Sequence, residues 1–260
     1  MKKILVTGAN GYIARAIIHK FNDTHEVNTL TRRDVDLTDS RDVDDYFKYY
    51  QFDVVIHCAV QGGSRLQPET MDMLDANLKM YYNLLKHKDK FSKFIHIGSG
   101  AELNAKHTPY GLSKHVINAS MSEKDNFYNL RIFGVFDENE LDTRFIKSNI
   151  KKYINHEPIE IHQMKKMDFI YMPDFLKILD RYINDVDGLP KELDCVYKDK
   201  NNLLAIACNI VSLSDHAVAM KINYNNIMKD YIGEYHEWLD GLDLIGLDTG
   251  IINVYEKLKG

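Results

Sequence analysis

Three residues near the middle of the chain have the types and spacing needed for proton transfer. Tyr110 and Lys114 stand four residues apart in Tyr-Gly-Leu-Ser-Lys, so on a helix they share one face. A neighbouring ammonium favours the phenolate and lowers the pKa of a tyrosine, which makes the phenol a usable proton donor and acceptor. Ser99 lies upstream in His-Ile-Gly-Ser-Gly. Alone, the pair is typical of a helix surface and the serine of a turn; together they predict an acid–base site.

A glycine-rich turn follows the first apolar run of the chain. From Thr7 to Ala14 the sequence reads Thr-Gly-Ala-Asn-Gly-Tyr-Ile-Ala, between a strand-like and a helix-like segment. Gly8 permits a tight turn, Gly11 lets the backbone approach a pyrophosphate, and the small Ala14 lets the helix pack on the strand. The N–H groups at such a helix start bind the anion. This context favours a dinucleotide site over a purely structural turn, with contacts assigned to Gly8, Asn10, Gly11, Tyr12 and Ile13.

Two arginines follow the second strand-like segment, in Thr-Arg-Arg-Asp. An acid at this point suits a ribose 2′-hydroxyl, whereas a guanidinium suits a 2′-phosphate. Arg32 and Arg33 therefore favour NADP over NAD, although Asp34 could compete and a solvated turn could hold the same residues. NAD stays the alternative. Asp36, which precedes Leu37, could hydrogen-bond to the adenine amino group or serve as a loop acid or helix cap.

The segments that position these residues alternate between strands and helices. Short apolar runs predict strands, and apolar residues three or four apart predict amphipathic helices. Such alternation gives βαβ units, hence a parallel sheet with helices on both faces. The predicted fold is α/β, a Rossmann-like doubly wound parallel sheet. The predicted strands are 3–6, 26–31, 53–59, 94–97 and 128–132, and the predicted helices are 11–21, 42–50, 71–87 and 110–121.

The second half of the chain is less regular and predicts a small, mostly C-terminal substrate-binding lobe. Its segments are helices at 145–154, 174–183 and 203–213 and a strand at 158–162. No linker rich in Pro, Gly or Ser separates the halves. We therefore expect a dinucleotide-binding domain at 1–135, to which 160–185 returns, and a lobe formed by 136–160 and 186–260.

The composition is that of an ordinary globular protein. The 260 residues are 45% hydrophobic and 27% charged, and the net charge of −5 gives no general attraction for nucleic acid. No apolar run approaches the ~20 residues that cross a bilayer. Cys58, Cys195 and Cys208 lack metal-ligand spacing and predict reduced thiols in a cytoplasmic protein. His57 and His96 lie on predicted strands, where hydrogen-bonded structural histidines are expected. We expect no metal, no membrane and no nucleic-acid partner.

Together, these motifs resemble the extended short-chain dehydrogenase/reductase superfamily, the NAD-dependent epimerase/dehydratase family, which acts mainly on nucleotide sugars. The resemblance covers nearly the whole chain. It implies that Ser99, Tyr110 and Lys114 are catalytic, with Lys114 also holding the nicotinamide ribose. It further implies a homodimer built from the helices at 71–87 and 110–121. The cofactor contacts that it implies beyond the glycine turn are Asp36, Leu37, Cys58, Ala59, Val60, Asn77, Tyr110 and Lys114.

Within that family the chain is similar to reductases of the GDP-fucose synthase and dTDP-4-dehydrorhamnose reductase types. The former epimerise with a cysteine and a histidine, whose places here hold Ala101 and Arg144. The resemblance therefore implies an NADPH-dependent reductase of a keto group, at C4, on a nucleotide-activated sugar in polysaccharide biosynthesis. A nucleotide-sugar 4-epimerase with tightly bound NAD(P) and a non-catalytic NAD(P)-binding sensor or scaffold are the alternatives. Arg144, Lys147 and Lys166 are candidates for binding the diphosphate.

Overall fold

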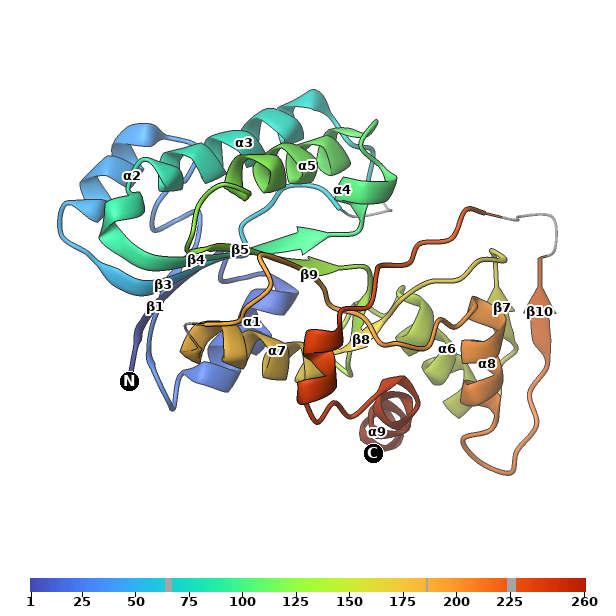
Figure 1. Ribbon diagram of the computed structural model, residues 1–260. Coiled ribbons are helices and arrows are strands. Elements are labelled where there is room, and N and C mark those ends of the chain that lie inside the picture. Colours follow the sequence, from blue (N-terminus) through green and yellow to red (C-terminus); the bar gives the residue numbers. More distant parts are fainter. Residues whose placement is uncertain (64–66, 186, 224–227) are drawn as a thin grey trace. The chain divides into compact units, whose positions relative to one another are not determined.

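The computed structural model in Figure 1 describes residues 1–63, 67–185, 187–223 and 228–260. The chain divides into two compact units. Unit 1 holds Met1–Arg131 and Asp180–Leu193, and unit 2 holds Ile132–Leu179 and Asp194–Gly260. The segment that returns to unit 1 therefore begins at Asp180, later than the expected 160, and ends at Leu193, whereas residues 160–179 are grouped with unit 2.

Unit 1 is built on a six-stranded sheet in the order β2-β1-β3-β4-β5-β9. The pairs β1–β2, β1–β3 and β3–β4 are parallel. Helices α2, α3 and α5 lie along one face and α1 along the other, which confirms the predicted doubly wound α/β fold (Figure 1). The strands are β1 (Lys3–Thr7), β2 (Glu26–Leu30), β3 (Phe52–His57), β4 (Phe91–Ser99), β5 (Phe127–Ile132) and β9 (Glu192–Asp194). The helices are α1 (Tyr12–Phe21), α2 (Ser40–Phe47), α3 (Met71–Leu85), η1 (Lys88–Lys90), α4 (Ala101–Asn104) and α5 (Pro109–Met121).

The central strands are apolar on both faces, as strands covered by helices on both sides must be. In β3 and β4 nearly every residue is buried. A core of aromatic and aliphatic side chains lies between the sheet and helices α2, α3 and α5, and it includes Phe47, Tyr81 and Phe94. Burial of this kind supplies most of the free energy that holds a domain together. It also fixes the strand ends, where the candidate residues lie.

The strand order reverses between β1 and β3. From β1 the chain crosses to β2 on one side of the sheet, and from β3 onward the strands are added on the other side. Ligands of open α/β sheets bind at such a switch point, outside the carboxyl ends of the strands. Thr7 and His57 end β1 and β3 and are direct register partners, so the glycine turn lies at the switch point.

Unit 2 has a core of its own. Buried side chains from its short strands and helices, among them Tyr153, Phe169, Ile206 and Val254, pack into one cluster. Two small parallel sheets, β10-β7 and β6-β8, contribute to it. The elements are β6 (Val135–Phe136), α6 (Phe145–Ile154), β7 (Ile159–Ile161), β8 (Ile170–Tyr171), α7 (Met172–Asn184, whose last turn belongs to unit 1), α8 (Leu203–Val211), β10 (Met220–Ile222), η2 (Glu237–Gly241) and α9 (Leu247–Lys259).

Within the described part of the chain, no helix is both long enough and apolar enough to cross a membrane.

Candidate active site

The glycine turn between β1 and α1 brings its backbone against the end of β3. Gly8 has a φ of +67°, which favours glycine. A Cβ at Gly8 would stand 2.7 Å from the backbone nitrogen of Ala59, so a larger residue would collide with the neighbouring strand end. Gly11 donates its N–H to the Gly8 carbonyl (2.9 Å) and is the N-cap of α1. No side chain caps this helix start, so its first-turn N–H groups suit an anion such as a pyrophosphate.

The hydroxyl of Thr7 ties the first and third strand ends together. Its Oγ1 accepts a hydrogen bond from the Ala59 N–H (3.2 Å) and lies 2.9 Å from Nδ1 of His57. Burial lowers the pKa of His57 to about 3, so the ring is neutral, and its Nδ1 shares a hydrogen bond with the Thr7 hydroxyl. His57 is thus the hydrogen-bonded structural histidine that the sequence predicts.

The turn after β2 presents its guanidinium groups to solvent. Asp34 folds back on its own turn, where its carboxylate accepts hydrogen bonds from the N–H and the hydroxyl of Thr31 (2.8 and 2.6 Å). These bonds lower the pKa of Asp34. The side chain of Arg32 is 73% exposed and its Nε lies 3.5 Å from the carboxylate of Asp36. Asp36 in turn accepts hydrogen bonds from the N–H and hydroxyl of Thr38 (2.9 and 2.7 Å).

The loop after β3 is held in place by Asn77 of α3. Its carboxamide oxygen accepts the Gln61 N–H (2.7 Å), while its nitrogen donates to the Gln61 carbonyl (2.9 Å) and to the Ser113 hydroxyl of α5 (3.1 Å). The side chain is 2% exposed. Asn77, proposed from the resemblance as a cofactor contact, therefore uses its carboxamide to hold the loop that begins with Cys58, Ala59 and Val60.

Helix α5 places Tyr110 in its first turn. Thr108 is the N-cap, and its hydroxyl accepts the Gly111 N–H (3.1 Å), while Pro109 occupies the first helical position. The Tyr110 N–H donates to the carboxylate of Glu69 (2.8 Å). On the other side, Gly63 has a φ of +76°, and a Cβ there would lie 3.0 Å from Cζ of the Tyr110 ring. The phenol is therefore confined between its own helix and the loop after β3.

Lys114 follows one helical turn later and is 4% exposed. Its Nζ donates to the carbonyl of Ile97 on β4 (2.5 Å), lies 3.3 Å from Nε2 of His96, and stands 5.9 Å from the centroid of the Tyr110 ring. Burial lowers the pKa of Lys114 to about 8, and Glu102 and Cys58 oppose this shift. The pKa of His96 lies well below its usual value, for the same reason of burial. The neutral imidazole can thus accept a hydrogen bond from the ammonium.

Ser99 ends β4 two residues beyond Ile97 and is 8% exposed. Its Oγ accepts the N–H of Ala101 (3.2 Å), the first residue of the short helix α4. The turn from α4 into α5 is closed by Thr108, whose hydroxyl donates to the Ala105 carbonyl (3.1 Å). The structure thus connects the three predicted catalytic residues: Tyr110 and Lys114 share one helix, and Lys114 is bonded to the strand that ends in Ser99.

Several residues that surround the three candidate catalytic residues were not predicted from the sequence. Glu69 and Gly63 contact Tyr110, His96 contacts Lys114, and Glu102 is fully buried beside Ser99. The Gly-Gly pair at 62–63 after a strand was a readable turn signal. The contacts of Glu69 with Tyr110 and of His96 with Lys114 join segments 41 and 18 positions apart, so spacing could not reveal them.

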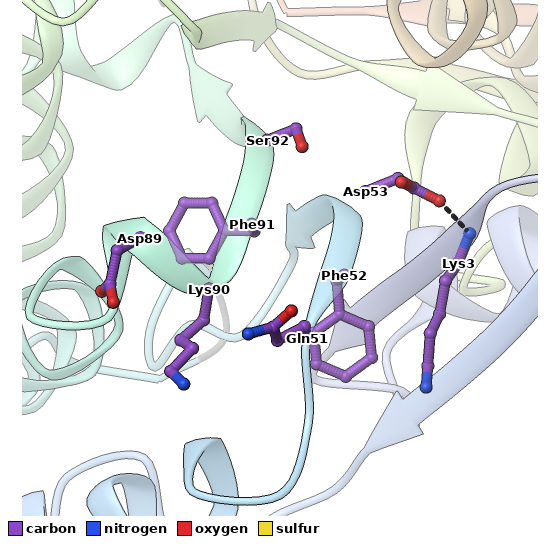
Figure 2. A pocket seen from close by; sticks show the side chains of 8 residues that line it. All are labelled: Lys3, Gln51, Phe52, Asp53, Asp89, Lys90, Phe91 and Ser92. Carbon is purple, nitrogen blue, oxygen red and sulfur yellow. Dashed lines mark hydrogen bonds between the residues drawn. The ribbon is translucent and has the colours of Figure 1, made fainter.

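A pocket of about 300 Å³ opens at the opposite edge of the sheet, at the amino ends of β1, β3 and β4 (Figure 2). Asp53 accepts the Lys3 N–H there (2.7 Å), and Lys90 and Asp89 lie at the far wall. This edge lacks both the glycine turn and the predicted catalytic residues. The candidate active site is therefore the carboxyl edge.

Unit 2 contains the three cations proposed for the diphosphate. Lys147 is buried; its Nζ donates to the Glu140 carbonyl (2.7 Å) and pairs with Asp142 (2.8 Å), so its charge is used within the unit. Arg144 and Lys166 are exposed. Among the described residues, no group of three His, Cys, Asp or Glu side chains could hold a metal ion.

Comparison with known proteins identifies the family of this chain. Residues 4–195 match the NAD dependent epimerase/dehydratase family. The chain belongs to this family, and it is thus an NAD(P)-dependent oxidoreductase of the short-chain dehydrogenase/reductase type. The family and the fold expected from the motifs are confirmed.

Individual relatives are distant. The spore coat polysaccharide biosynthesis protein SpsK of Bacillus subtilis (strain 168) is 29% identical over 114 residues, which cover 42% of this chain and 40% of that protein. GDP-L-colitose synthase of Yersinia pseudotuberculosis is 22% identical over 233 residues, 74% of this chain and 75% of that one. Among solved structures, the GDP-mannoheptose C4 reductase MlghC of Campylobacter jejuni with NADP bound superposes with a TM-score of 0.82 at 14% identity, over 99% and 98% of the chains.

Proposed function

We propose that this chain is an NADPH-dependent reductase of a keto group, at C4, of a nucleotide-activated sugar. The observation that carries the proposal is the position of Lys114, one helical turn after Tyr110 and hydrogen-bonded to the strand that ends in Ser99. Relatives named as a GDP-L-colitose synthase and a GDP-mannoheptose C4 reductase support the substrate class.

The carboxyl edge of the sheet fits a dinucleotide. The glycine turn meets Ala59 so closely that only a glycine backbone fits at position 8, and the start of α1 carries no side-chain cap. Arg32 and Arg33 support NADPH over NADH, since Asp34 is bound to its own turn and does not occupy the guanidinium groups. The exposed pair between Arg32 and Asp36 is weak, so a 2′-phosphate can replace the carboxylate.

When bound, NADPH supplies the hydride that is added to the keto carbon. Tyr110 donates its phenolic proton to the keto oxygen, and solvent returns that proton to the phenolate. Ser99 donates a hydrogen bond to the same oxygen and stabilises the negative charge that develops on it. Lys114 holds the nicotinamide ribose and, as an ammonium, favours the phenolate that Tyr110 leaves behind. The balance is one ketone, one NADPH and one proton converted to one alcohol and one NADP⁺.

The residue two positions beyond Ser99 favours simple reduction. Ala101 is buried at the start of α4 and has no group that could remove a proton from carbon. The chain therefore lacks, at this position, the acid–base residue that epimerising reductases of the family carry. We infer that it reduces the sugar without inverting neighbouring carbons.

Replacement of Tyr110 tests the proposal. Tyr110→Phe removes only the ionisable hydroxyl, and general acid catalysis contributes about 10²–10⁴-fold. We expect NADPH oxidation with GDP-, dTDP- or UDP-activated 4-keto sugars to fall at least about 100-fold, while NADPH still binds. Tyr49→Phe, at an exposed tyrosine beyond α2, is the matched control and should keep full turnover. Turnover by Tyr110→Phe within a few-fold of the natural chain would show that the mechanism is wrong.

A further inference from the structure

Glu102 is a carboxylate that the mechanism above does not use. It lies on α4, three residues after Ser99, and its side chain is 0% exposed. Moving a carboxylate out of water costs several kcal/mol, and an apolar side chain of similar size is often as stable or more stable at such a place. A buried acid beside a catalytic serine therefore requires an explanation other than the stability of the fold.

The contacts of Glu102 lead to both sides of Ser99. Its Oε1 accepts a hydrogen bond from Asn129 Nδ2 (2.7 Å) and lies 3.0 Å from Nε of Arg131 on the same strand, β5. Asn129 and Arg131 press against Gly98, where a Cβ would overlap the Asn129 carboxamide and stand 3.1 Å from Arg131 Cγ. A closed series of contacts results: the backbone leads from Gly98 through Ser99 to Glu102, Glu102 contacts Asn129 and Arg131 of β5, and these two side chains pack against Gly98. This ring fixes the turn that presents the serine.

The second carboxylate oxygen of Glu102, Oε2, does not take part in these contacts. Within the described residues, Oε2 is buried without a hydrogen-bond partner. Arg131 already has a second carboxylate, because its terminal nitrogen pairs with Glu192 of β9. One neutral acceptor at the position of Oε1 would satisfy Asn129, so holding the turn does not by itself require a charge.

The charge of Glu102 affects the protonation state of Lys114, as the other titratable groups near this lysine show. His57 and His96 are neutral, because burial lowers the pKa of each ring. Cys58 is a thiol at pH 7, because burial raises its pKa to about 12. Of the groups that raise the pKa of Lys114, Glu102 has the larger effect and is the one that titrates near neutrality, with a pKa of about 7.

We propose that Glu102 is a positioning residue of the reductase site: its buried carboxylate fixes the Ser99 turn through Asn129 and keeps Lys114 in the ammonium form. This inference rests on the proposed function, since it takes Lys114 as the group that holds the nicotinamide ribose. Arg131, Glu192 and Lys114 are the charged groups that act on the pKa of Glu102. Arg131 and Lys114 favour the carboxylate, and Glu192 opposes it.

The test is the pH dependence of NADPH affinity, measured by calorimetry between about pH 7 and 9.5 without any sugar. The natural chain should bind less tightly as the pH rises through the pKa of Lys114, about 8. Glu102→Gln keeps the shape and the Oε1 acceptor and removes the charge, so the pKa of Lys114 falls. The loss of affinity should then begin about one pH unit lower.

Glu192→Gln is the matched control. It removes the other carboxylate of Arg131, which is partly exposed, and leaves Glu102 in place. Its pH dependence should follow the natural chain. Equal pH dependence for Glu102→Gln and Glu192→Gln would overturn the proposal, because Glu102 would then be merely structural.

Catalytic measurements separate the two roles of Glu102. With an active 4-keto sugar, Glu102→Gln should leave kcat close to the natural value at a pH where Lys114 keeps its proton, since the Oε1 acceptor that holds Asn129 and the Ser99 turn is retained. If Glu102→Gln does not fold, Glu102→Asp retains the charge with a shorter reach: its pH dependence should match the natural chain while kcat falls, and a shifted pH dependence would contradict the inference. If no sugar is turned over, the proposed function fails, and the NADPH measurement still decides the role of Glu102.

Discussion

At the scale of single residues, the site depends on how burial sets charge. The side chains of Lys114, His57 and His96 lie close together, and removal from water penalises the charged form of each. Only the lysine keeps its proton at pH 7, with a pKa of about 8. As the pH rises through this value the ammonium is lost, so cofactor binding should weaken on the alkaline side.

The choice between NADPH and NADH is also decided by single residues. Arg32→Ala and Arg33→Ala should each weaken NADPH binding about 10-fold or more, because a charged hydrogen bond contributes about 1.5–3 kcal/mol. NADH binding should change little, since it lacks the 2′-phosphate. Arg41→Ala, at an exposed arginine paired with Asp39, is the control. Titration of each variant with both cofactors is the measurement, and tighter binding of NADH by the natural chain would reverse the assignment.

Some residues of the site could be predicted from the sequence because their chemistry depends on neighbours in the chain. Gly8 and Gly11 are read from a strand–turn–helix context, and Tyr110 with Lys114 from helical spacing. The hydrogen bond that Asn129 donates to Glu102 joins residues 27 positions apart. The interaction of Asn77 with Ser113 spans 36 positions. Such contacts depend on how α4 packs on β5 and how α3 packs on α5, which spacing along one segment does not define.

At the scale of elements, the first turn of α5 is the part on which the site depends most. Thr108 caps this helix by accepting the Gly111 N–H, and Tyr110 follows two residues after Thr108 on the face that also carries Lys114. A cap satisfies one of the otherwise unpaired N–H groups at the helix start. Loss of the cap should therefore loosen Tyr110 as well as reduce stability.

Thr108→Ala should lower the free energy of unfolding by about 1 kcal/mol and the melting temperature by about 2–4 °C, together with a fall in kcat. Asn202→Ala removes the equivalent cap of α8 in unit 2, where the carboxamide accepts the Ala205 N–H (2.7 Å). This variant should lower the free energy of unfolding by a similar amount and leave kcat unchanged. Thermal unfolding and steady-state kinetics of both variants provide the comparison. Equal effects of the two variants on kcat would show that the α5 cap matters only for stability.

Element prediction succeeded where the periodicity was strong. The helix expected at 145–154 is α6 with the same bounds, and the strand expected at 128–132 is β5. Helix α9 was not predicted, although Leu247, Ile251, Val254 and Tyr255 are buried along one face at helical spacing. Strand β9 has only three residues and no alternation to read, so its place at the sheet edge depends on β5.

At the scale of the whole molecule, the chain combines a cofactor-binding unit with a unit that has its own core. Unit 1 contains all the residues proposed to bind the cofactor or to catalyse. Unit 2 contains Arg144 and Lys166, the two exposed cations that stay candidates for the diphosphate. The homodimer through α3 and α5 and the cytoplasmic location stay predictions from the sequence and its family.

A reductase and a 4-epimerase differ in the fate of the hydride, so a labelled cofactor distinguishes the two activities. NADPH carrying deuterium at the transferred position of its nicotinamide ring is incubated with the chain and a nucleotide-activated 4-keto sugar, and the product is analysed by mass spectrometry and NMR. A reductase should place one deuterium at C4 of the sugar for each NADPH oxidised. A sugar that changes configuration without net cofactor oxidation, or label that stays on the nicotinamide, would contradict the proposed reductase function.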